Sequence, residues 1–274
     1  MSLKQNFMNW NNPGVALITG ASSGIGASYA HLLSAQGFET ILVARRKERL
    51  EDLARELEQN TSNKATDVVA DLSKLDDINS VAEKIEGLKN LDVLVNNAGF
   101  GMKGYFEGQP LNGIKEMMIV HNIAPVLLSR CVLPGMIKQN RGVIINVSSM
   151  AAFIPRPQNV MYGSTKKFLN RFSEELQLEL HDTNVKIQAL CPGYTRTEIL
   201  DGKYLKNFDL PSIPEELWMS ADEVVELSLS ACQNKEVVFI PGEPNQKFIE
   251  LYTNPKLGKR TRENMRKARI IPRK

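Results

Sequence analysis

Short apolar runs alternate with amphipathic helical stretches along most of the 274-residue chain. Strands that alternate with helices indicate βαβ units, and such units build a parallel sheet. The alternation therefore predicts an α/β fold built on a parallel sheet. The expected strands are 15–18, 40–43, 68–70, 91–95, 142–147, 185–190 and 237–240. The expected helices lie at about 47–59, 74–87, 160–182 and 221–233, with a first one that stops near Gly37 and a long one that runs through Asn122 to about 137.

The first expected strand leads directly into a glycine-rich turn. Gly20, Gly24 and Gly26 follow the pattern Gly-x-x-x-Gly-x-Gly, and an expected helix begins there. Glycines at such a turn let backbone N–H groups approach a pyrophosphate at the helix N-terminus. A tight strand-to-helix turn without a ligand is the structural alternative. The strand–turn–helix context favours a nucleotide site.

A tyrosine and a lysine lie four residues apart on the expected helix 160–182. Tyr162 and Lys166 would share one helix face, and Ser149 follows the expected strand 142–147. These groups could converge at the carboxyl edge of the sheet. Because a neighbouring cation favours an ionised phenol, Lys166 is expected to lower the pKa of Tyr162. The trio could then exchange a proton with a carbonyl or alcohol oxygen that the serine hydroxyl holds.

Composition and charge argue against several other classes of protein. A net charge of +3 and a charged content of 24% are ordinary for a soluble globular chain and do not indicate nucleic-acid binding. The three cysteines lack metal-ligand spacing, so we expect reduced thiols, a cytoplasmic location and no metal site. No signal peptide is expected, and no run approaches the roughly 18 apolar residues of a membrane span.

Positive charge is concentrated near the C-terminus, in an extension at about 244–274. Residues 256–274 hold nine Lys or Arg and one Glu, which leaves a net charge of −5 for the rest of the chain. A solvated helix or a frayed terminus is one interpretation. The functional alternatives are a dimer contact, an anionic membrane surface or the phosphates of a thioester carrier.

Several motifs, taken together, resemble the short-chain dehydrogenase/reductase family. They are the turn at 19–26, Asn96-Asn97-Ala98-Gly99, Asn122, Ser149, Tyr162, Lys166 and Pro192-Gly193. The resemblance extends from residue 13 to about 242 and includes the order and spacing of these motifs. It implies a single NADP-binding Rossmann domain over 1–274, with a seven-stranded parallel sheet ordered 3-2-1-4-5-6-7 and helices on both faces. It also implies a homodimer or homotetramer.

The amino-acid sequences of three segments narrow the resemblance to a subgroup of the family. Residues 133–136, 145–149 and 189–193 are similar to bacterial members related to 3-oxoacyl thioester and 17β-hydroxysteroid reductases. Animal relatives of these enzymes carry membrane anchors, and we expect none here.

The resemblance also implies roles for individual residues. Tyr162 would be the acid/base, Lys166 would hold the nicotinamide ribose, and Ser149 would polarise the carbonyl. Asn122 would support a water-linked proton relay. Cofactor contacts are further expected from Gly20, Ser22, Ser23, Gly24, Ile25, Gly26, Asp71, Leu72, Asn97, Ala98, Gly99, Pro192, Gly193, Thr195 and Thr197.

The end of the second expected strand bears on the choice of cofactor. Family members that prefer NAD carry there an acid for the ribose hydroxyls, whereas this chain has Ala44 followed by Arg45 and Arg46. A guanidinium can hold a phosphate through two parallel hydrogen bonds. Two solvated arginines would be the structural alternative, but cations are poorly placed at a helix N-terminus. The sequence therefore predicts NADPH over NADH, resting mainly on Arg45.

Three segments are expected to be less regular. Pro125 should bend its helix or free a carbonyl close to Asn122. The glycine-rich residues 100–113 predict a loop over the site. Residues 198–219 hold many apolar side chains without a clear period, so a partner surface, disorder and a mobile lid compete. A lid is favoured because the segment follows a strand's carboxyl end.

Three functions follow from these observations. The leading hypothesis is an NADPH-dependent reductase of an apolar ketone, aldehyde or 3-oxoacyl thioester. An alcohol or hydroxysteroid dehydrogenase that runs oxidatively is the second. A non-catalytic module that senses NADP(H) is the third. The apolar lid favours an apolar substrate of medium to large size, unless its side chains pack on the protein itself.

Overall fold

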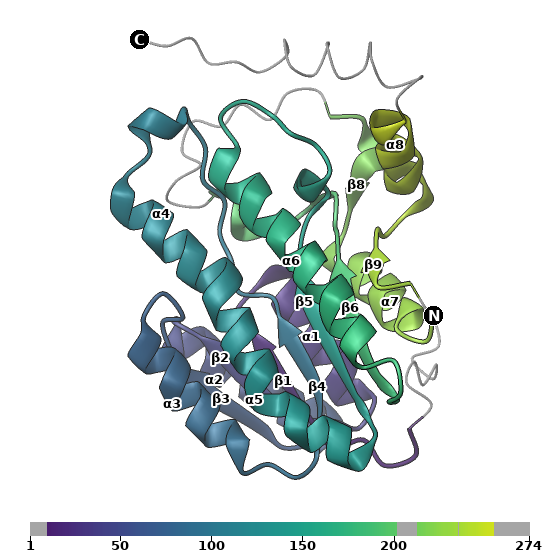
Figure 1. The fold of residues 1–274 in the computed structure, drawn as a ribbon. Helices are drawn as coiled ribbons and strands as arrows, with labels where there is room; N and C mark the ends of the chain where they lie inside the picture. Colours follow the sequence, from purple (N-terminus) through teal and green to yellow (C-terminus); the bar gives the residue numbers. More distant parts are fainter. Residues whose placement is uncertain (1–9, 202–212, 235, 255–274) are drawn as a thin grey trace.

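A parallel sheet of seven strands forms the centre of the molecule (Figure 1). The computed structural model describes residues 10–201, 213–234 and 236–254. The strands are β1 (Val15–Thr19), β2 (Glu39–Ala44), β3 (Ala65–Val69), β4 (Leu91–Asn96), β5 (Gly142–Val147), β6 (Val185–Leu190) and β9 (Val238–Phe239), in the order β3-β2-β1-β4-β5-β6-β9. The predicted fold class and strand order are therefore confirmed.

Helices cover both faces of the sheet (Figure 1). One face packs against α1 (Gly24–Ala35), α2 (Lys47–Thr61) and α7 (Ala221–Ala231). The other packs against α3 (Leu75–Glu86), α5 (Ala124–Gln139) and α6 (Val160–Glu179), and α4 (Leu111–Met118) precedes α5. Because both faces are covered, β1, β4 and β5 are buried along their whole length. Their apolar runs are for that reason continuous rather than alternating.

The structure differs from the sequence prediction at several boundaries. The strand predicted at 68–70 begins earlier, at Ala65. Four of the five residues of this edge strand are half-buried or exposed, so they give a weak apolar signal. The loop predicted at 100–113 holds a short 3-10 turn (Phe106–Gly108) and ends where α4 begins. Two strands of two residues each, β7 (Tyr194–Thr195) and β8 (Trp218–Met219), pair outside the main sheet and were not predicted.

The helical stretch Leu111–Gln139 contains the irregularity that Pro125 predicts. Residues Ile119–Ile123 form a π turn, in which the N–H of Ala124 donates to the carbonyl of Ile119. Pro125 has no N–H, so the normal ladder cannot continue there. This 29-residue stretch is long and apolar enough to cross a membrane, but half of its most apolar window is buried in the protein, and core helices pass the same test.

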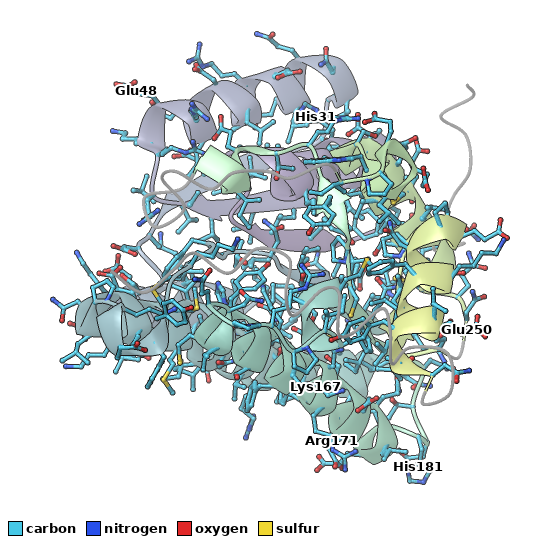
Figure 2. All side chains as sticks on the ribbon, turned by 90° about the horizontal axis from the view of Figure 1, so that it is seen from above. His31, Glu48, Lys167, Arg171, His181 and Glu250 are labelled. Atoms are coloured by element: carbon cyan, nitrogen blue, oxygen red, sulfur yellow. The ribbon has the colours of Figure 1, made fainter. Side chains whose placement is uncertain are left out.

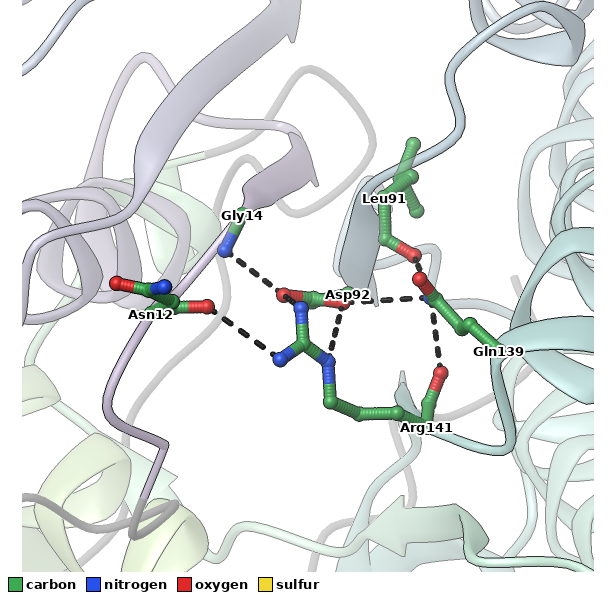
Figure 3. Close-up of polar contacts among 6 residues, drawn as sticks. All are labelled: Asn12, Gly14, Leu91, Asp92, Gln139 and Arg141. Atoms are coloured by element: carbon green, nitrogen blue, oxygen red, sulfur yellow. Dashed lines mark hydrogen bonds and ion pairs between the residues drawn. The ribbon is translucent and has the colours of Figure 1, made fainter.

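A buried carboxylate in β4 ties together the amino-terminal ends of β1 and β4 (Figure 3). Asp92 is fully buried and accepts hydrogen bonds from the N–H of Gly14 (2.8 Å) and from the Arg141 guanidinium (2.6 and 3.0 Å). Gln139 lies on the other side and donates to the carbonyls of Leu91 and Arg141. Burial raises the pKa of Asp92, and the hydrogen bonds from Gly14 and Arg141 oppose that shift.

Replacing Arg141 tests this anchor. Arg141→Met should lower the free energy of unfolding by about 2–4 kcal/mol, because it leaves the buried Asp92 charge with a single strong partner. The matched control is Arg55→Met, since the Arg55–Asp52 pair is 69% exposed on both sides and should change stability by less than about 1 kcal/mol. Urea unfolding measures both variants. Equal effects at the two positions would contradict the assigned role of the anchor.

Candidate active site

A cavity of about 1010 Å³ opens at the carboxyl ends of β1, β2, β4, β5 and β6. This is the edge at which ligands bind in open α/β sheets. Of the residues that the sequence singles out, the following line it: Gly20, Ser22, Ser23, Gly24, Ile25, Arg45, Arg46, Asp71, Leu72, Asn97, Ala98, Gly99, Ser149, Tyr162, Lys166, Pro192, Gly193, Thr195 and Thr197. Gly26 and Asn122 are not among its lining residues. This volume is at the upper end of the roughly 300–1,000 Å³ of a typical small-molecule site.

The glycine turn forms a close-fitting cradle at one end of this cavity. Gly20 and Gly24 have φ values of +66° and +56°, which residues with a side chain rarely adopt. A Cβ on Gly24 would also lie 2.9 Å from the side chain of Thr197. Gly26 takes a structural part, since its Cβ would lie 2.3 Å from the carbonyl oxygen of Gly20. Asn97 braces the turn by donating to the carbonyls of Thr19 and Gly20 (2.9 and 3.2 Å).

The first turn of α1 leaves its backbone donors uncapped. Ser23, at the N-cap position, makes no side-chain capping bond, and no acidic residue lies in the first turn. Such a helix end favours an anion, because its free N–H groups and the helix dipole both attract negative charge. The cradle and this helix end together fit the pyrophosphate of a dinucleotide.

A cluster of arginines stands beside the turn and already holds an anionic side chain. Arg46 donates to the hydroxyls of Ser22 (2.9 and 3.0 Å) and Ser23 (2.7 Å) and to the carboxylate of Glu198 (2.7 Å). Arg49 donates to the other oxygen of Glu198 at 2.7 Å. These hydrogen bonds lower the pKa of Glu198 to about 2. Arg45 lines the same cavity and is exposed.

Ser149, Tyr162 and Lys166 meet at the centre of the cavity. Ser149 hydrogen-bonds with Tyr162 and also accepts from the N–H of Ala151 at 3.1 Å. The Lys166 ammonium is buried, donates to the carbonyl of Val147 at 2.8 Å, and lies 5.7 Å from the centre of the Tyr162 ring. Burial lowers the pKa of Lys166 to about 8.

The pKa of Tyr162 moves opposite to the sequence-based expectation. Burial raises it, and the hydrogen bond with Ser149 only partly opposes the shift. Lys166 was expected to lower it, but its ammonium is directed to the carbonyl of Val147. The phenol is therefore protonated at neutral pH in this structure.

Asn122 lies in the π turn and contacts the helix that carries the tyrosine. Its side-chain amide donates to the backbone carbonyl of Thr165 at 3.0 Å. The contact ties the irregular part of the Leu111–Gln139 stretch to α6. The expected part of Asn122 in a proton relay stays a prediction.

His121 is a buried residue of the site that the sequence reasoning missed. Its Nε2 accepts from the N–H of Phe100 (3.1 Å), which leaves the proton on Nδ1, 3.0 Å from the hydroxyl of Thr165. The imidazole packs edge-on against the ring of Tyr162, and burial together with Lys166 holds its pKa well below the usual value. Only its position next to Asn122 could have pointed to it.

One part of the cavity lining, its apolar end, consists of apolar side chains, while Lys103, Glu116, Arg156 and Asn159 line the same cavity. The residues of this apolar end come from several segments and include Met102, Met150, Ile154, Leu217 and Phe248. Of the expected lid at 198–219, Glu198, Ile199 and Leu217 line the cavity, whereas 202–212 lie outside the described residues. Among the described residues no group of three or more His, Cys, Asp or Glu side chains is arranged to hold a metal ion.

Comparisons with known proteins agree with this geometry. A family model described as short chain dehydrogenase matches residues 14–206. The chain is 39% identical over 182 residues to 17-beta-hydroxysteroid dehydrogenase type 3 of Danio rerio, covering 65% of this chain and 59% of that protein. It is 36% identical over 203 residues to very-long-chain 3-oxoacyl-CoA reductase of Anas platyrhynchos, covering 72% and 64%. It thus spans about three fifths of the length of these relatives.

A solved structure extends the similarity to most of the chain. The short-chain dehydrogenase from Sphingobium yanoikuyae in complex with NADPH is 32% identical, with a TM-score of 0.79, and the match covers 94% of this chain and 98% of that one. The protein described here belongs to the short-chain dehydrogenase/reductase family. The motifs that carried the resemblance in the sequence all lie within or beside one cavity.

Proposed function

We propose that this protein is an NADPH-dependent oxidoreductase that reduces the carbonyl of an apolar ketone, aldehyde or 3-oxoacyl thioester. The observation that carries the proposal is that Ser149, Tyr162 and Lys166 line the same cavity as the glycine cradle. A substrate carbonyl and a nicotinamide could meet there. The named activities of the relatives, a hydroxysteroid dehydrogenase and a 3-oxoacyl-CoA reductase, both concern carbonyl or alcohol groups on large apolar molecules.

The chemistry divides between the cofactor and three side chains. Bound NADPH supplies the hydride. The Ser149 hydroxyl donates a hydrogen bond to the carbonyl oxygen, where negative charge develops during reduction. The Tyr162 hydroxyl gives its proton to that oxygen. Lys166 would hold the cofactor's ribose and would place a positive charge 5.7 Å from the centre of the Tyr162 ring, beside the tyrosinate that the proton transfer leaves behind.

The direction of reaction is supported by the pKa of Tyr162. Reduction requires the protonated phenol and oxidation requires the phenolate. Since burial raises this pKa, the phenol stays protonated and ready to act as an acid at neutral pH. This protonation state suits the reductive direction, which is the one we propose. Reduction should decline as the pH rises above about 8, where Lys166 loses its charge.

The preference for NADPH is supported by the arginine cluster. Arg46 and Arg49 hold the carboxylate of Glu198 beside the hydroxyls of Ser22 and Ser23, so this corner of the cavity binds anionic oxygens. The 2′-phosphate of NADPH is an anion of the same kind, and Arg45 is exposed nearby to meet it. Ala44 brings no negative charge that would repel it.

We also propose that the protein forms a homo-oligomer in the cytoplasm. Apolar side chains that a second copy could cover are exposed on the Leu111–Gln139 stretch and on α6, among them Ile123, Leu127 and Phe168.

The basic extension at about 244–274 includes α8 (Glu243–Thr253), while 255–274 lie outside the described residues.

Replacing Tyr162 separates an enzyme from a sensor that binds NADP(H) without turnover. Tyr162→Phe removes the proton donor and keeps the ring, so kcat for reduction of a 3-oxoacyl thioester should fall by about 10²- to 10⁴-fold. The Kd for NADPH, measured by fluorescence titration, should change little. Full retention of turnover in the variant would refute the mechanism, and a parent that binds NADPH but reduces no carbonyl would favour the sensor.

Cofactor choice is tested at the arginines. The parent should bind NADPH more tightly than NADH, and Arg45→Ala and Arg46→Ala should each weaken NADPH binding by about ten- to a hundredfold, because each removes charge-assisted hydrogen bonds to the 2′-phosphate. NADH binding should change less than threefold. Arg55→Ala, on the exposed side of α2, is the control and should change neither Kd. Equal affinity of the parent for both cofactors would overturn this part of the proposal.

A further inference from the structure

A single arginine enters the apolar end of the cavity between two prolines. Arg156 lines the cavity together with Met150, Ile154 and Phe248. Pro155 and Pro157 restrict the backbone on both sides of it, because proline fixes its own φ and limits the residue before it. A hydrogen bond from another helix also holds the segment in place, because the Tyr252 hydroxyl of α8 donates to the carbonyl of Pro155 at 3.4 Å. The position of Arg156 is therefore built into the fold.

The charge of Arg156 has no counter-ion among the described residues. Its Nη1 donates only to the neutral hydroxyl of Tyr194, at 3.4 Å. Its Nε is fully buried and has no hydrogen-bond partner. No carboxylate of a described residue forms an ion pair with it. A buried donor on a charged group is costly to leave unsatisfied, so such a group marks a place where a ligand supplies the partner.

Two other arginines, Arg46 in the cavity lining and Arg196 outside it, have partners for their guanidinium groups. Arg46 is paired with Glu198 and two serine hydroxyls. Arg196 is paired with Glu215 and also lies 5.1 Å above the ring of Trp218. An arginine that merely covers apolar surface keeps its head group in water. Arg156 fits neither pattern, because part of its head group is buried and unpartnered.

We infer that Arg156 binds an anionic group of the substrate, a carboxylate or a phosphate, while the apolar side chains beside it hold the substrate's hydrocarbon body. The inference rests on the proposed reductase function and narrows its substrate class. The preferred substrate is an apolar oxo compound that also carries an anionic end, and a planar guanidinium can bind such oxygens through two hydrogen bonds.

Matched pairs of ligands test this class and distinguish its two sources of charge. The carboxylate arm compares a long-chain oxo acid with its methyl ester. The phosphate arm compares a 3-oxoacyl-CoA with the 3-oxoacyl pantetheine thioester, which lacks the phosphates. The parent should prefer the anionic member of one pair by about ten- to a hundredfold in KM, and the pair that shows the preference identifies the source.

Substitutions at Arg156 should remove that preference. Arg156→Met should raise KM for the anionic member by the same factor. It should change KM for the neutral member by less than about threefold. Arg156→Lys keeps the charge and should restore part of the preference. Arg171→Met is the control, because Arg171 lies on the outer side of α6 and is 71% exposed (Figure 2). Thermal unfolding of each variant shows whether it is folded.

Binding without turnover keeps this inference separate from the proposed function. Calorimetric titration of the parent and of Arg156→Met with dodecanoate and with dodecanol needs no catalysis. Tighter binding of dodecanoate by the parent, lost in Arg156→Met, would support the anion site even if no carbonyl were reduced. Reduction of neutral ketones with no anionic preference in either pair would overturn the inference and leave the reductase standing.

Discussion

The attachment of α6 to the end of β5 is the contact on which the site depends. The Lys166 ammonium donates to the carbonyl of Val147, and the hydroxyl of Ser148 donates back to the carbonyl of Lys166 at 2.9 Å. Deeper in the fold, Asn146 of β5 donates to Ser173 of α6 at 2.9 Å. These bonds fix the helix that carries Tyr162 against the strand that leads to Ser149. They thereby help to hold the Tyr162 hydroxyl within hydrogen-bonding distance of the Ser149 hydroxyl.

The buried ammonium also sets the electrostatics of the cavity. Removing Lys166 from water lowers its pKa, and its charge helps to keep the neighbouring His121 neutral. Removing Tyr162 from water raises its pKa. Burial therefore favours the uncharged form of both Lys166 and Tyr162. The result is a protonated phenol beside a buried ammonium whose pKa is lowered to about 8.

The cavity carries positive charge at both ends, and the two ends differ in how that charge is balanced. At the glycine cradle, Arg46 and Arg49 share the carboxylate of Glu198. At the apolar end, Arg156 has a hydroxyl as its partner. An anionic cofactor would compete with an internal carboxylate at the first end, whereas an anionic substrate would find an open position at the second. Both ends favour ligands that combine an apolar or aromatic body with negative charge.

The fold and much of the cavity lining could be predicted because their signals are local. Apolar runs, the glycine turn at Gly20 and Gly24, and the spacing of Tyr162 and Lys166 each lie within a few residues of sequence, and the family pattern supplied the strand order. Contacts between distant residues left no such signal. Arg156 meets Tyr194 across 38 positions, Arg141 meets Asp92 across 49, and Arg46 meets Glu198 across 152. The shift in the pKa of Tyr162 was missed for the same reason, since it depends on burial.

Following the hydride tests the proposed reaction most directly. The parent protein is incubated with NADPH that carries deuterium at C4 of the nicotinamide, in both stereochemical forms, and with a 3-oxoacyl thioester. Mass spectrometry of the alcohol should find deuterium on the carbinol carbon with one of the two forms and hydrogen with the other, because a fixed cavity presents one face of the cofactor to the substrate. Alcohol that lacks deuterium with both forms, or no alcohol at all, would contradict the account.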